Sequence, residues 1–178
     1  MGLSIMAVNK NYGFTKCGDD KKKNETFGST DIGYIGYKIF RDNLIKFASD
    51  GRILSIDELE LFFNKSYFHN DKTFKIALES DFATEELKDD KVQAYIEKLK
   101  KIKSIYPKVY DIIPLVLHCD CEGEIPFSQI KPILPILNDF HKYDKSNYGY
   151  SGREYNFTED LIEVIEEAIK NKGKLYFC

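Results

Sequence analysis

The stretch Leu3-Ser4-Ile5-Met6-Ala7-Val8 is the best starting point for predicting the fold of this 178-residue chain. Its side chains are mostly apolar, and Asn9-Lys10-Asn11 ends it with polar residues, as is typical of a buried strand. Lys174 to Phe177 has the same character at the other end, just after Gly173. We therefore expect an α+β fold whose small sheet includes both terminal strands and is covered by several helices.

Helical spacing of apolar residues predicts the elements between these strands. Ser55 and Glu58 have the spacing of a capping box, as do Asn156 and Glu159, and Thr84 is a candidate cap of a long helix. We expect helices over 34–48, 56–63, 84–104 and 157–172, and a buried segment, helical or extended, over 109–117.

The first of two polar regions is predicted to be a solvated loop or the tip of a hairpin, and the second is predicted to be a loop. Residues 11–30 are rich in Gly, Asp, Lys and Asn, and residues 141–155 are rich in Tyr, Gly, Ser and Asn. Between them, Pro132 and Pro135 argue against an unbroken helix through the ten residues after Pro126.

Length and composition indicate one domain over 1–178. The net charge of −3 argues against general nucleic-acid binding. No apolar run is long enough for a membrane span, so we expect no membrane partner. Four cysteines without a secretion signal are interpreted as reduced thiols, which predicts a cytoplasmic protein.

The densest group of chemically active side chains runs from His118 to Glu124. If Gly123 is the glycine of a calcium loop, ligand positions fall on His118, Asp120 and Glu122. The closing position then falls on Gln129 rather than a bidentate glutamate, so calcium would bind weakly.

Zinc is the second ion considered for this segment, with Cys119 and Cys121 as soft ligands, although Cys-x-Cys is not the common knuckle spacing. The structural alternative is a turn at Gly123 whose carboxylates are solvated and cap the next helix. We favour that alternative, and so expect no tightly bound cofactor.

A second cluster combines aromatic rings with one arginine. Such rings beside Gly, Ser and Arg form a rigid contact surface for a protein partner, or a stack for a nucleobase. The structural alternative is a surface loop whose rings pack on the domain. The cluster consists of Tyr143, Tyr148, Tyr150, Arg153 and Tyr155.

Several segments together resemble a family of small uncharacterised bacterial proteins with a Leu-x-His-x-Asp-Cys-x-Gly-Glu core. They are the opening strand, Gly33 to Arg41, Pro114 to Glu124, and the closing strand. Cys119 stands where the family has Ser, and Glu122 where it has Asp. The layout is also similar to small immunity proteins that neutralise toxins. The resemblance implies an architecture and a biological setting, but no activity.

The sequence contains no nucleotide-binding loop, dinucleotide fingerprint or serine elbow. The leading hypothesis is therefore a non-enzymatic inhibitor, of the immunity or anti-defence type, acting through protein–protein interaction by occluding a partner in bacterial or phage conflict. One alternative is a binder or hydrolase of a nucleotide-like small molecule, stacked on Tyr148 or Tyr150 with its phosphate at Arg153. Another is a cation-dependent enzyme using Asp120 and Glu122.

Overall fold

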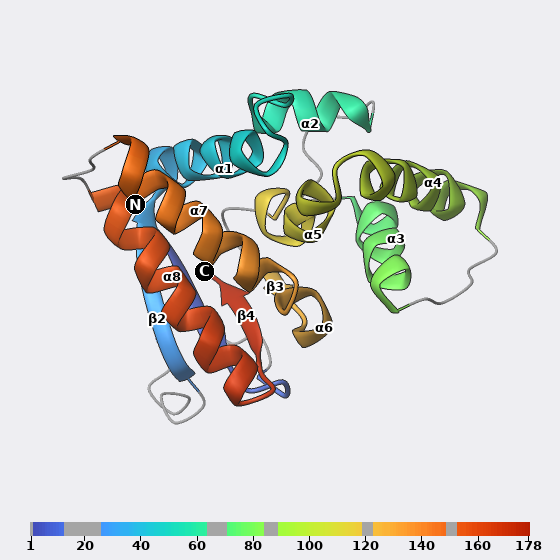
Figure 1. Cartoon of the computed structure of the whole chain (residues 1–178). Helices are drawn as coiled ribbons and strands as arrows, with labels where there is room; N and C mark the ends of the chain where they lie inside the picture. Colours follow the sequence, from blue (N-terminus) through green and yellow to red (C-terminus); the bar gives the residue numbers. More distant parts are fainter. Residues whose placement is uncertain (1, 13–25, 64–70, 84–88, 119–122, 149–152) are drawn as a thin grey trace. The chain divides into compact units, whose positions relative to one another are not determined.

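The computed structural model describes residues 2–12, 26–63, 71–83, 89–118, 123–148 and 153–178 (Figure 1). The chain divides into a sheet unit, residues 1–38 with 120–178, and a helical unit, residues 39–119. Each unit contains fully buried apolar side chains, such as Leu3 in the first and Leu99 in the second. The expectation of one domain over 1–178 stays a prediction.

In its described residues, the sheet unit contains a four-stranded antiparallel sheet in the order β2-β1-β4-β3. The first strand pairs directly with the last, with Ile5 opposite Phe177 and Val8 opposite Lys174. The α+β class and the sheet containing both terminal strands are therefore confirmed. The strands are β1 (Gly2–Val8), β2 (Thr26–Gly33), β3 (Gly123–Ile125) and β4 (Lys174–Phe177).

Three helices of the sheet unit follow one another in sequence: α6 (Phe127–Ile130), α7 (Ile133–Tyr148) and α8 (Arg153–Lys170). Helix α8 lies along the sheet and packs on β2, β1 and β4, while α7 packs on α8 (Figure 1). The ring of Tyr37 is fully buried and lies 6.4 Å from that of Phe157 and 6.5 Å from that of Phe177. Aromatic packing therefore joins α8 and the last strand in one core.

The turn from α8 into β4 brings two backbone segments unusually close. Lys172 adopts a positive φ of 50°, and the Gly173 N–H donates to the Ala168 carbonyl oxygen at 2.8 Å. A Cβ atom on Gly173 would lie 2.3 Å from the Val8 carbonyl oxygen. Glycine is therefore required here by the close approach of β1, because any side chain would collide with its backbone.

The helical unit contains most of α1 (Tyr34–Ala48), which begins in the sheet unit, and four further helices within its described residues. Helix α4 packs on α3 and on α5. The long helix predicted over 84–104 thus belongs to the helical unit and not to the unit that holds the sheet. The further helices are α2 (Ile56–Phe62), α3 (Lys72–Ala83), α4 (Asp90–Ile105) and α5 (Pro107–Val116).

The two loop predictions were wrong where elements form in polar sequence. Strand β2 begins at Thr26, inside the predicted segment 11–30, and extends to Gly33, because pairing with β1 stabilises a strand whose only buried side chain is Thr30. Helices α7 and α8 occupy most of 141–155. Pro135 does not prevent α7, because it lies in the first turn, where a backbone N–H has no helical partner to lose.

Two predicted helix starts also need correction. Asp89, not Thr84, caps α4, and its carboxylate accepts from the N–H groups of Lys91 at 2.8 Å and Val92 at 3.3 Å. Thr84 lies outside the described residues. Helix α8 begins at Arg153, before the capping box at Asn156, because buried Phe157 already packs within the helix. The segment 109–117 is confirmed as buried, and it is helical.

In the described ranges of the chain, no helix is both long and apolar enough to cross a membrane.

Candidate protein-binding surface

Only part of the segment from His118 to Glu124 lies among the described residues. His118 is half-buried after α5, and its carbonyl oxygen accepts from Arg41 Nη1 at 3.1 Å. Asp120 and Glu122 lie outside the described residues, as do Cys119 and Cys121. Among residues that the structure does describe, no three His, Cys, Asp or Glu side chains gather where they could hold a metal. The calcium and zinc sites stay predictions.

The turn predicted at Gly123 stays a prediction, because residues 119–122 lie outside the described part of the chain and Gly123 is the first residue of β3. Gly123 has a φ of 140°, which is unfavourable for residues with a side chain. The next residue, Glu124, does not project freely, because its carboxylate pairs with the Lys174 ammonium on β4. That pair joins two neighbouring strands, so Glu124 has a role in the sheet.

The predicted aromatic cluster is divided between the end of α7 and the start of α8. Tyr143 is exposed on α7 over 43% of its surface. Tyr148 is the last residue of α7, and Arg153 and Tyr155 lie in the first turn of α8. Tyr150 and the side chains of the other three lie outside what the structure describes. Whether these side chains meet stays a prediction.

The helical unit presents a better-defined surface on α2. Its first turn is fixed by three hydrogen bonds. Ser55 Oγ accepts from the Glu58 N–H at 3.3 Å, and Glu58 Oε2 accepts from the Leu54 N–H at 2.7 Å. Asp42 Oδ1, on α1, accepts from the Ile56 N–H at 2.7 Å. The predicted cap of Ser55 on Glu58 is thus confirmed, whereas the Glu58 carboxylate reaches back to Leu54, one residue before the N-cap, and not to the Ser55 N–H of a standard capping box.

The other end of α2 is fixed as well. Phe63, its C-cap, is buried, and its ring meets the ring of Phe74 on α3 edge-on at a centroid distance of 5.3 Å. Its carbonyl oxygen accepts from the Lys98 ammonium of α4 at 2.8 Å. Ile56 and Leu59 are buried on the same helix. Helix α2 is therefore a rigid element despite its short length.

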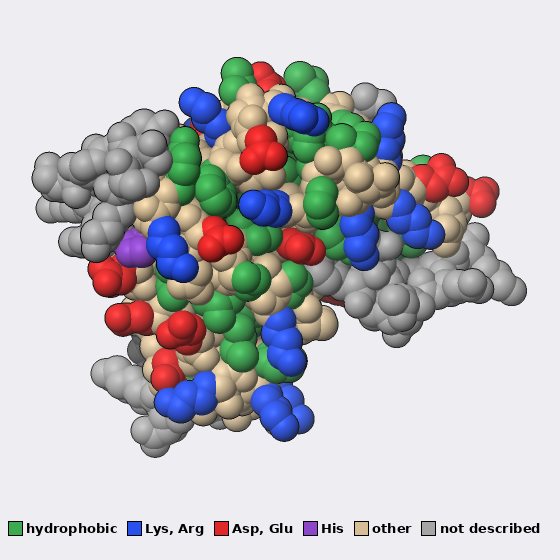
Figure 2. All heavy atoms as spheres, viewed as in Figure 1, with side chains coloured by type: hydrophobic (Ala, Val, Ile, Leu, Met, Phe, Trp, Pro, Cys, Tyr) green, Lys and Arg blue, Asp and Glu red, His purple; other side chains and the backbone are tan. Residues whose placement is uncertain are grey.

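The outward side of α2 carries large apolar groups. Leu61 is 71% exposed, and Leu54, just before the N-cap, is 54% exposed. Leu54 is seven positions before Leu61 and lies outside the helix, which begins at Ile56. Asp57 and Glu58 are exposed between them. We call these four residues the α2 surface. Figure 2 shows hydrophobic and charged side chains intermixed over this helix.

The sequence contained a signal for this surface that the capping box alone did not reveal. Ile56, Leu59 and Phe63 account for the buried side of α2. Leu61 falls on a different side of the same helix, and Leu54 precedes its N-cap. A short helix with apolar residues on two sides is expected to cover two partners, one inside the fold and one outside it.

Comparison with known proteins adds no family. No protein-family model, no curated protein and no solved structure matches this chain. The resemblance drawn from the sequence stays a prediction, and the candidate surface is defined by its geometry alone.

Proposed function

We propose that the protein is a non-enzymatic binding protein, an inhibitor or immunity factor of bacterial or phage conflict that works in the cytoplasm. It occludes a partner protein with the α2 surface. The observation that carries the proposal is the exposure of Leu61 on a helix fixed at both ends and of Leu54 just before its N-cap. The absence of catalytic sequence motifs and the layout shared with immunity proteins support the same class.

A few leucine side chains on a capped helix can supply much of the free energy of binding. Fully burying a leucine side chain contributes about 1.5–3 kcal/mol. A helix that is already capped loses little conformational freedom when it binds, so more of that gain remains as affinity. An exposed apolar residue on a helix, with a second just before its N-cap, suits insertion into a hydrophobic groove.

The charges beside the leucines define the partner further. Asp57 and Glu58 are exposed next to the anchors, and opposite charges across an interface increase the association rate and the specificity. The partner that fits the α2 surface therefore has an apolar groove with lysine or arginine at its rim.

The test is affinity capture from the native host, followed by mass spectrometry of proteins and of small molecules released by denaturation. The wild type is compared with Leu61→Glu and with the control Ile76→Glu, which changes another exposed aliphatic residue, 45% exposed on α3. We expect a stoichiometric protein with the wild type and the control, and its loss with Leu61→Glu. Thermal melts of the variants verify that both fold.

Two results contradict the proposal. One is a partner captured equally by Leu61→Glu. The other is release of a nucleotide without any protein partner, which supports the small-molecule alternative at Tyr148, Tyr150 and Arg153. The cation-dependent alternative at Asp120 and Glu122 has a separate test, calcium or zinc titration followed by calorimetry.

A further inference from the structure

A pocket of about 480 Å³ lies in the helical unit, and no residue of the α2 surface lines it. This volume is in the range of small-molecule sites, about 300–1,000 Å³. The pocket combines two lysines, one carboxylate and aromatic carbon. Its walls include Phe63, Asp71, Lys91, Ala94, Tyr95 and Lys98.

The carboxylate of Asp71 accepts three hydrogen bonds from groups of α3 and α4. Its Oδ1 accepts from the N–H groups of Thr73 at 2.9 Å and Phe74 at 3.2 Å, at the start of α3. Its Oδ2 accepts from the Tyr95 hydroxyl at 2.8 Å. Asp71 therefore fixes α3 against α4, and within the described residues it forms no ion pair with either pocket lysine.

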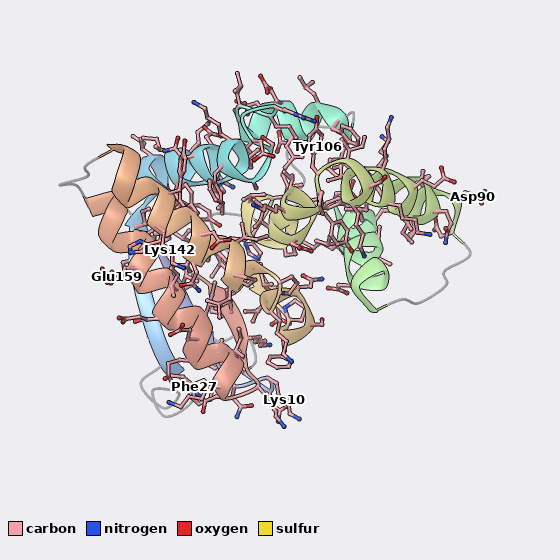
Figure 3. The ribbon with its side chains drawn as sticks, in the orientation of Figure 1. Lys10, Phe27, Asp90, Tyr106, Lys142 and Glu159 are labelled. Carbon is pink, nitrogen blue, oxygen red and sulfur yellow. The ribbon has the colours of Figure 1, made fainter. Side chains whose placement is uncertain are left out.

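The two lysines leave positive charge at the pocket. Lys98 Nζ donates to the Phe63 carbonyl oxygen at 2.8 Å, which uses one of its three N–H donors and fixes the ammonium in place. Lys91 lies in the first turn of α4, next to Asp90, which Figure 3 labels at the start of that helix. A positive charge there opposes the helix dipole, so helix stability does not account for Lys91.

The floor between the lysines includes aromatic carbon of Phe63 and Tyr95. Both rings meet the buried ring of Phe74 edge-on, at 5.3 Å and 5.5 Å. Ala94 is exposed, and its single methyl group leaves space above α4. Lys91 and Lys98 are seven residues apart, about 10.5 Å along the helix. An anion held by one lysine thus leaves room for a flat group over the floor.

We propose that this pocket binds a small organic anion that joins a phosphate to a flat ring, of the nucleoside monophosphate class. Lys91 holds the phosphate through charge-assisted hydrogen bonds, and the ring covers Ala94 and the aromatic edges. This site is independent of the α2 surface and of the predicted nucleotide site at Tyr148, Tyr150 and Arg153.

The test is calorimetric titration of the full chain with AMP, with inorganic phosphate and adenosine as separate ligands. We expect AMP to bind with a Kd below about 1 mM and at least about tenfold more tightly than either fragment. Lys91→Ala should weaken AMP about tenfold by removing one charged contact. Ala94→Leu should weaken it at least as much by filling the pocket.

The matched control is Lys46→Ala, which removes the same charge from an exposed lysine of α1 that does not line the pocket. It should leave the AMP affinity within about twofold of wild type. AMP binding that is no tighter than phosphate binding, or unchanged by Ala94→Leu in a folded variant, overturns the assignment. So does the absence of AMP binding up to about 5 mM.

Discussion

The sheet unit and the helical unit differ in how closely their segments pack, with backbone against backbone in the first and a pocket between segments in the second. In the sheet unit, the first and last strands meet directly, and Gly173 lies against the β1 backbone. In the helical unit, α2 exposes Leu54 and Leu61, and a pocket opens beside α3 and α4. The contrast lies in the backbone contact and the pocket, since large apolar side chains are exposed in both units, Ile35 of the sheet unit at 80%.

The strongest test of that contrast is Gly173→Ala. The added Cβ would collide with the Val8 carbonyl oxygen, so β1 and β4 must separate. Overpacking of this kind lowers the free energy of unfolding by about 1–3 kcal/mol, and contact with backbone places this variant at the upper end. Urea denaturation followed by circular dichroism measures it.

The matched control is Gly33→Ala at the end of β2, where an added Cβ meets nothing within 4 Å and φ is not positive. Its free energy of unfolding should change by less than about 0.5 kcal/mol. Equal effects of the two substitutions would show that the sheet unit is not tightly constrained at the point where the chain ends meet.

A smaller loss is expected from Gly123→Ala in the same unit. The φ of 140° at Gly123 strains any residue with a Cβ, so the free energy of unfolding should fall by about 1 kcal/mol or more. The same denaturation experiment measures it. A neutral result would mean that β3 can shift its backbone without cost.

In the helical unit, we expect the free energy of unfolding to depend on side-chain caps at helix ends rather than on close backbone contact. Asp89→Ala removes both hydrogen bonds to the first turn of α4 and should cost about 1 kcal/mol. Asp90→Ala, one residue later, keeps the cap and should cost less, about 0.3 kcal/mol. Hydrogen exchange should locate the loss in α4. Equal costs for the two aspartates would contradict the role assigned to Asp89.

The elements predicted well from the sequence are those whose signals are local. The apolar run of β1, the spacing of α1 and the Ser55 cap correspond to short-range physics. Strand β2 and helix α7 could not be found that way. Pairing with β1 stabilises β2, and packing on α8 stabilises α7, whatever their polar composition and prolines favour locally.

The candidate sites show the same limit. A turn at Gly123 was predicted because a glycine among acidic residues is a local pattern, and the observed φ of 140° is one that favours glycine. The pocket joins Phe63, Asp71 and Lys91, which come from three separate segments. No spacing rule brings such residues together, because only the packing of α3 on α4 does so.

The smallest expected effect concerns Asp111 on α5. Burial raises the pKa of its carboxyl above the ordinary value of 3.8, with Lys103 opposing the shift. The folded protein then holds this proton to higher pH than the unfolded chain, so stability falls as pH rises from about 3.8 through the raised pKa. Asp111→Asn should remove that fall. A fall of unchanged size in pH-dependent melts would contradict it.

The most direct test of binding through the α2 surface is hydrogen–deuterium exchange of the protein alone and with the partner captured from the host. We expect slower exchange over residues 54–63, around α2, when the partner is bound, and unchanged exchange in β1 and β4. Slower exchange confined to residues 143–155 or to the strands, with α2 unchanged, would contradict the assignment of binding to the helical unit.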